Sequence, residues 1–115
     1  MRNHFVICDR YEVVVLPFPF AEVPAIKRRP AVVISGKAFN TGNRSTLVAM
    51  ITSSTKETWP SDVIIDDRLS AGLKVPCRVR WRMTTVPNDL ILKSIGILKG
   101  MDRIHCEREF GTMVG

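Results

Sequence analysis

The sequence predicts a mainly β protein, a small and strongly bent β-barrel that ends in one helix. Short runs of β-branched and aliphatic residues recur at regular intervals, and Pro, Gly, Asn or Asp residues separate them. Helical spacing of apolar side chains is seen at the C-terminal end of the chain. Many short strands with turn signals between them are typical of small barrels. An open sheet covered by the helix is the alternative.

The predicted strands stop where turn-forming residues interrupt them. The first, residues 11–17, is rich in valine and ends at Pro-Phe-Pro, which cannot continue a central strand. Between the second and third strands, Ala-Phe-Asn-Thr-Gly-Asn-Arg-Ser combines turn chemistry with room for a single helical turn. The five later strands are expected at residues 29–35, 46–52, 61–66, 77–83 and 93–99.

Residues 101–115 are expected to form the terminal helix. Asp102 stands at its start, where an N-cap carboxylate would accept backbone amide hydrogens. Ile104, Phe110 and Met113 recur at helical spacing and are expected to form the stripe that packs on the barrel.

Length and composition indicate one globular domain, residues 1–115. The chain is 45% hydrophobic and 24% charged, which is typical of ordered proteins. It has no apolar run near the ~20 residues that span a bilayer, and residues 5–8 are too short for a signal peptide. A cytoplasmic location is expected. Three scattered cysteines and two histidines predict neither a disulfide framework nor a metal site, and no cofactor is expected.

Positive charge is unevenly distributed along the chain. The net charge is +6 at pH 7, and no Asp or Glu lies between Glu22 and Glu57, an interval that contains Lys27, Arg28 and Arg29. A second acid-free interval runs from Arg68 to Asn88. Clustered cations without anions are typical of nucleic-acid binders or of proteins with acidic partners, although basic surfaces without such a role are also common.

The fifth predicted strand alternates strictly between two kinds of side chain. Cys77, Val79, Trp81 and Met83 share one face, and the other face carries Arg78, Arg80 and Arg82. Neighbouring guanidiniums repel one another, so an anion is expected along them, and the planar fork of arginine suits phosphate. A solvated outer face is the alternative reading.

Two further features point to chemistry on a phosphate. Pro30 restricts the backbone of Arg29 to extended geometry, and a pre-oriented cation can stabilise charge that develops in a transition state. Thr52 and Ser53 belong to a hydroxyl cluster at the end of the third strand, where they could bind phosphate oxygens. Each feature also has a plain structural reading, as the start of a strand and as a turn closed by its own hydroxyls.

In this order, the segments YEVVVLPFPFAEV, KRRPAVVIS, LVAMITSST, AGLKVPCRVRWRMTTV and LILKSIGILKGMD resemble the MazF/PemK toxins of bacterial toxin–antitoxin pairs. The resemblance covers roughly residues 11–102. It implies an SH3-like barrel that dimerises and cuts single-stranded RNA without a metal. The family's catalytic arginine and threonine match Arg29 and Thr52, and a second family arginine matches Arg80. Glu22 is the candidate counterpart of an acidic residue in the first loop, and Arg82 replaces an acidic residue found in many relatives.

Together these observations predict the toxin of a type II toxin–antitoxin system, an mRNA interferase that leaves 2′,3′-cyclic phosphate and 5′-hydroxyl ends. Arg29 and Thr52 are the expected catalytic residues, with three candidate helpers: Glu22, Ser53 and Arg80. RNA binding is assigned to Lys27, Arg28, Arg78, Arg80 and Arg82. An antitoxin with an acidic segment is the expected partner.

Two alternatives use the same barrel, a non-catalytic RNA binder and a gyrase poison. The gyrase poisons look to carry a tryptophan close to the C-terminus, whereas this chain has Trp59 and Trp81, both well upstream of its end.

Overall fold

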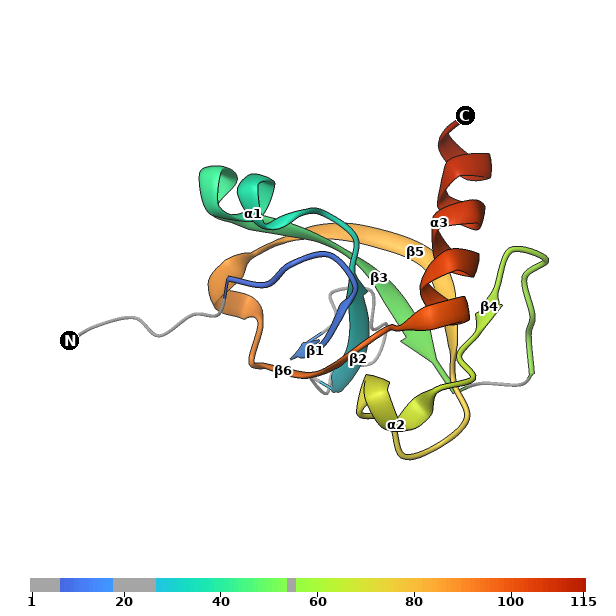
Figure 1. Ribbon diagram of the computed structural model, residues 1–115. Helices are drawn as coiled ribbons and strands as arrows, with labels where there is room; N and C mark the ends of the chain where they lie inside the picture. Colours follow the sequence, from blue (N-terminus) through green and yellow to red (C-terminus); the bar gives the residue numbers. More distant parts are fainter. Residues whose placement is uncertain (1–6, 18–26, 54–55) are drawn as a thin grey trace.

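The computed structural model describes residues 7–17, 27–53 and 56–115, which fold into one curled antiparallel sheet with three α-helices and one short 3-10 helix, η1 (Asn88–Leu90) (Figure 1). The sheet has six strands in the order β4-β5-β3-β2-β1-β6. The mainly β barrel fold predicted from the sequence is confirmed, as a half-barrel. The strands are β1 (Glu12–Pro17), β2 (Arg28–Val33), β3 (Ser45–Thr52), β4 (Val63–Ile64), β5 (Arg78–Pro87) and β6 (Lys93–Ile97).

Two register shifts help to curl the sheet. The pairing of β3 with β5 shifts between Ala49 and Ile51, and the pairing of β1 with β6 shifts between Val13 and Val14. Such irregularities bend a strand and increase its local twist. The curled sheet buries apolar residues on both faces, which explains why its central strands read as nearly continuous apolar runs.

Alternate residues of the central strands enter two separate cores. Val13, Val32 and Ile51 pack with Trp81 and Leu98 in one cluster. The other cluster contains intervening residues of the same strands together with partners from other parts of the chain: Cys8, Val14, Leu16, Ala31, Val33, Val48, Val86 and Ile91. Each strand is therefore held by apolar contacts on both sides.

Helix α1 (Lys37–Asn43) is the helical turn expected between β2 and β3. Its Asn40 is fully buried. The Asn40 amide donates to the carbonyls of Cys8 at 2.9 Å and Ser35 at 3.1 Å, and the Asn40 carbonyl accepts from Asn88 at 2.8 Å. Asn88 in turn accepts from the Thr46 hydroxyl at 2.7 Å. This satisfied polar network joins distant segments of the chain.

Helix α3 (Gly100–Val114) corrects two predictions for the C-terminal region. It begins before Asp102, with Lys99 at the N-cap position. The Asp102 carboxylate is buried and accepts the amides of Asp66 at 3.0 Å and Asp67 at 2.9 Å, so it anchors another segment rather than capping its own helix.

The apolar stripe predicted on α3 was also wrong in part. Ile104 is 47% exposed and Met113 is 43% exposed, whereas Phe110 packs against Trp81 with ring centroids 6.2 Å apart. Helix α3 packs its buried Cys106 inward instead. None of the helices in the described part of the chain is long and apolar enough to cross a membrane.

Helix α2 (Arg68–Ala71), which the sequence analysis did not anticipate, packs directly on the backbone of β6. A Cβ added to Gly96 would lie 2.3 Å from the Ala71 carbonyl carbon, and one added to Gly72 would lie 2.1 Å from the Ile95 oxygen. Gly72 also has φ +74°, a left-handed conformation that favours glycine. The two glycines therefore set how close α2 lies to the sheet.

Substituting Gly96 by Ala should destabilise the fold, because the new methyl group would clash with the backbone of α2. Backbone atoms, unlike a side chain, cannot move aside by changing rotamer. We expect a loss of about 1–3 kcal/mol in the free energy of unfolding, as for other overpacked sites. Gly111→Ala is the matched control. Apart from the backbone of its own helical turns, no described atom lies within 4 Å of its added Cβ. Gly111 lies within α3, so Gly111→Ala should stabilise by up to about 1 kcal/mol. Urea unfolding of both variants measures the difference, and equal effects would contradict the close packing of α2 on β6.

Candidate functional site

Arg29, Thr52 and Arg78 lie in a row across three neighbouring strands. The pairing of β2 with β3 places Val32 opposite Ala49 and Ala31 opposite Met50. The last pair of this register is Ala31 with Met50, and from its continuation by two residues we infer that Arg29 comes opposite Thr52. On its other side Thr52 pairs with Arg78 of β5. Residues directly opposite one another project from the same face, and neighbouring strands lie about 4.8 Å apart. We call these three residues the cross-strand row.

A pocket of about 370 Å³ opens between β2, β6 and the segment that connects α2 to β5. It lies on the face of the sheet that carries Ile51 and Ser53, and of the cross-strand row only Arg29 lines it. Its floor is apolar and includes Val15, Ile51 and Ile95. Four cations line it: Arg28, Arg29, Lys74 and Lys93. No carboxylate occurs among the described residues of its wall. We call it the cationic pocket. Cations gathered without anions create a positive potential that concentrates anionic ligands.

A second pocket of about 340 Å³ adjoins the first. It is lined by Ser53, Ile64, Val75, Pro76, Cys77 and Arg78. Three of these residues, Ser53, Val75 and Cys77, also line the cationic pocket, so the two form one continuous depression. We call the second the apolar pocket, because Arg78 is its one charged residue among those described.

The two hydroxyl residues at the end of β3 have different environments. Thr52 is buried, with 9% of its surface exposed, whereas Ser53 is exposed where the two pockets meet. Thr52 is thus held rigidly between two arginine-bearing strands. Ser53 is accessible to a bound molecule.

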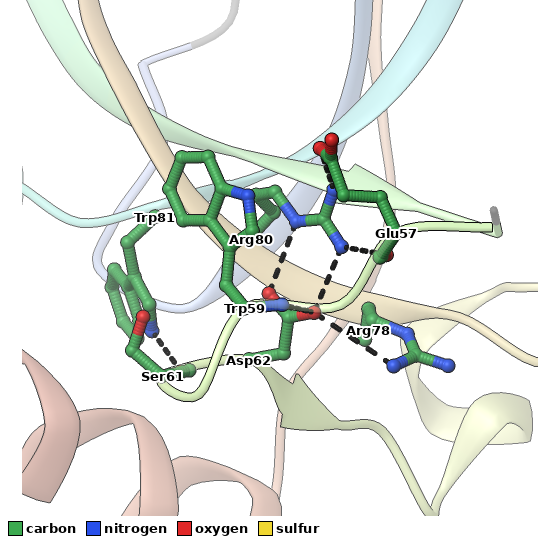
Figure 2. A network of polar contacts seen from close by, with 7 residues as sticks. All are labelled: Glu57, Trp59, Ser61, Asp62, Arg78, Arg80 and Trp81. Carbon is green, nitrogen blue, oxygen red and sulfur yellow. Dashed lines mark hydrogen bonds and ion pairs between the residues drawn. The ribbon is translucent and has the colours of Figure 1, made fainter. Parts of the chain in front are cut away.

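Arg80 lies in a buried polar network rather than in the pockets (Figure 2). Its Nε donates to Asp62 Oδ1 at 3.1 Å, and its Nη2 donates to Asp62 Oδ2 at 2.8 Å and to the Glu57 carbonyl at 2.7 Å. The guanidinium also lies 5.2 Å from the centroid of the Trp59 ring. With its side chain only 7% exposed, Arg80 is committed to contacts within its own chain.

Asp62 is the carboxylate on which this network is built. It also accepts the Trp59 amide at 3.0 Å and lies 3.7 Å from Nη1 of Arg78. Burial alone would raise its pKa, but the hydrogen bonds from Arg80 and Trp59 and the charges of Arg80 and Arg78 hold that pKa below its ordinary value. Asp62 is therefore an anion at neutral pH. It holds the segment that follows the hydroxyl cluster against β5.

The three arginines of β5 are placed differently from one another. The alternation on the other face is as predicted, since Cys77, Val79 and Trp81 are in the core. However, Arg78 lines the apolar pocket, Arg80 is buried, and Arg82 is exposed and lines neither pocket. They do not form a row of equally accessible guanidiniums, because the register shift beside Ala49 and the carboxylate of Asp62 interrupt it.

The remaining candidates divide into those at the pockets and those elsewhere. Arg28 and Arg29 line the cationic pocket, whereas Lys27 is exposed and is not part of either wall. Glu22 lies outside the described residues. Among those that are described, no three His, Cys, Asp or Glu side chains are grouped to hold a metal ion.

Cys77 lines both pockets but is not a nucleophile candidate. Its side chain is buried, and burial raises the pKa of the thiol. Reactive cysteines have a lowered pKa, because the thiolate is the nucleophile. The chemistry available at the pockets is therefore that of guanidinium, ammonium and hydroxyl groups.

Sequence reasoning missed three residues that shape this site: Asp62, Lys74 and Lys93. Lys93 is placed by β6, which pairs it with Val15, itself the partner of Pro30. Lys74 is placed by the close packing of Gly72 on β6. Lys74 did belong to the second acid-free interval, which was a usable signal. Nothing in the sequence marked Asp62 as the partner of Arg80, since they are separated by 18 residues.

Comparison with known proteins places the chain in a family. The family model of PemK-like, MazF-like toxins of type II toxin–antitoxin systems matches residues 9–114. No curated protein matches the chain closely enough to count as a relative.

Solved structures share its fold at low sequence identity. The MazF toxin of Deinococcus radiodurans superposes with a TM-score of 0.74 at 19% identity, over 96% of this chain and 98% of that one. A MazE–MazF complex from the same organism gives a TM-score of 0.75 at 17% identity, over 96% and 98%. An endoribonuclease of a mycobacterial species, bound to its cognate antitoxin, gives 0.71 at 13% identity, over 95% and 94%. The chain belongs to the PemK-like, MazF-like toxin family of type II toxin–antitoxin systems.

Proposed function

We propose that this toxin is an endoribonuclease that cleaves single-stranded RNA, an mRNA interferase. The observation that carries the proposal is an acid-free pocket that four cations line, Arg29 among them. Ser53 places an exposed hydroxyl at its wall, directly after Thr52 at the end of β3. A phosphodiester bound there would meet several cations and that hydroxyl.

RNA carries its own nucleophile, so the protein need supply neither a metal nor a thiol. The 2′-oxygen attacks the adjacent phosphorus and forms a new P–O bond, and the P–O5′ bond breaks. The 2′-OH proton passes to water, and the departing O5′ takes a proton from Arg29 or from water. The products end in a 2′,3′-cyclic phosphate and a 5′-hydroxyl.

Each residue of the site has a distinct part in this reaction. Arg29 stabilises the charge of the pentavalent phosphorane, since its backbone is restrained by Pro30 before substrate arrives. Thr52, assisted by the exposed Ser53, holds a non-bridging oxygen or the 2′-OH. Arg28, Lys74 and Lys93 bind neighbouring phosphates of the strand, and Arg78 binds it at the apolar pocket.

Arg80 acts as a positioning residue in this proposal, because its guanidinium is already occupied by Asp62 and Glu57. It holds the segment after the hydroxyl cluster rather than touching RNA. Lys27 and Arg82 would contribute only long-range attraction.

The proposal includes a partner, an assembly and a location. An antitoxin with an acidic segment would compete with RNA for the cationic pocket, and that complex should weaken with salt. We also propose a homodimer acting in the cytoplasm, where mRNA is found. Structures of related toxins with antitoxins support a partner of this kind.

The test is an RNA oligonucleotide of mixed sequence, and the same oligonucleotide with one 2′-deoxy nucleotide at the cleavage position. We expect cleavage of the first, in the presence of EDTA, with cyclic phosphate ends detected by mass spectrometry. The second should bind but remain intact, because it lacks the nucleophile. Binding of both without cleavage would instead favour a non-catalytic RNA-binding barrel.

A further inference from the structure

The apolar pocket is the feature that the proposed chemistry leaves unused. Its walls include Ile64, which is 62% exposed, and Val75, which is 51% exposed. Burying such side chains against a ligand is favourable, since each exposes apolar surface to water. Pro76 adds a rigid apolar surface beside them.

The position of this pocket follows from the sheet register. Arg78 pairs with Thr52 on one side and with Ile64 of β4 on the other. The cross-strand row therefore continues by one strand, from Arg29 through Thr52 and Arg78 to Ile64. Three strand spacings of about 4.8 Å, or about 14 Å in all, separate Arg29 from Ile64. An RNA strand that follows the row from its scissile phosphate at Arg29 would therefore reach Ile64 about two nucleotides away.

The two adjoining pockets differ in chemistry in the same way as the phosphate and the base of a nucleotide. Four cations line the cationic pocket, whereas one cation and several apolar side chains line the apolar pocket. The cationic pocket suits the phosphates of the strand. An unstacked base needs an apolar wall on its flat face and polar groups at its edge, which here are Arg78 and Ser53.

We propose that the apolar pocket binds the base of a nucleotide about two positions from the cleaved phosphate, between Ile64, Val75 and Pro76, with Arg78 at the base edge or its phosphate. This inference rests on the proposed function, because it takes single-stranded RNA as the ligand. It identifies Ile64 and Val75 as determinants of substrate selection.

The test combines a variant of the pocket with abasic RNA. The Ile64→Ser/Val75→Ser protein removes the apolar walls at two exposed positions. Leu69→Ser is the matched control, since Leu69 is 92% exposed on α2 and lines neither pocket. Oligonucleotides carrying one abasic site at successive positions around the cleavage site are assayed for binding by fluorescence anisotropy.

We expect the double variant to bind intact RNA about tenfold more weakly, because it removes the apolar surface that two side chains would bury against the base. For the unmodified protein, one abasic position should cause a similar loss. At that position the double variant should show no further loss, because the pocket is already disabled. Leu69→Ser should retain the profile of the unmodified protein.

The binding measurement separates this inference from the proposed activity. If RNA binds but is not cleaved, the activity proposal fails while the abasic profile still tests the pocket. If the double variant lost affinity at the same abasic position as the unmodified protein does, the base-binding assignment would be overturned. Unchanged RNA binding accompanied by weakened self-association in sedimentation would overturn it too, because the pocket would then serve a protein contact.

Discussion

Arg29→Ala is expected to reduce the rate of RNA cleavage by about 10²–10³-fold, the usual cost of removing one preorganised donor from a transition state. Arg29 lines the cationic pocket together with Arg28, Lys74 and Lys93. No carboxylate among the described residues pairs with it, so its charge remains available to a phosphate. Its loss should act mainly on the chemical step, because other cations remain to bind the strand.

Two measurements separate catalysis from binding in this variant. Single-turnover cleavage reports the rate, and anisotropy with the 2′-deoxy oligonucleotide reports affinity. Arg108→Ala is the matched control, since it removes one positive charge from an exposed position of α3 outside both pockets. Arg29→Lys should give an intermediate rate, because it keeps the charge and loses the planar fork. Equal cleavage by the Arg29→Ala and Arg108→Ala proteins would show that Arg29 is not catalytic.

Arg80→Met is expected to destabilise the fold by about 3–5 kcal/mol, since it leaves a buried carboxylate without its main partner. Asp62 has a side chain only 5% exposed, and it receives two hydrogen bonds from Arg80. The double variant Arg80→Met/Asp62→Leu should recover much of that loss, because it removes both charges together. Urea unfolding at neutral pH measures the three proteins. Additive losses in the double variant would contradict the coupling.

Acid should weaken the same contact. The pKa of Asp62 is lower in the folded chain than in the unfolded chain, where it is about 3.9. The ionised Asp62 therefore contributes its full stabilisation at pH values above its pKa in the unfolded chain. That contribution is lost as the pH falls through its lower pKa in the folded chain. Below about pH 4, the unmodified protein should lose stability more steeply than the Arg80→Met/Asp62→Leu variant.

Predictions that depended on local pattern agree with the structure. The valine-rich runs became the strands of the sheet, and the alternation in β5 placed Cys77, Val79 and Trp81 in one core. Short-range periodicity is enough for these assignments, because burial on one face of a strand repeats every second residue. The terminal helix was also expected, but Asp102 was assigned to the wrong hydrogen bonds, since its partners lie 35 and 36 residues away.

By itself, the sequence determined that this chain is a small β protein with clustered cations, and that Arg29, Thr52 and the arginines of β5 are the residues to consider. Only the tertiary structure decided which of them share a site. The pairing of β3 with β5 brings Thr52 and Arg78 side by side, and the pocket between β2 and β6 gathers Arg29 with Arg28, Lys74 and Lys93. Asp62 withdraws Arg80 from the surface. The physical reason is that strand register and ion pairing join residues far apart in the chain, and neither can be read from local spacing.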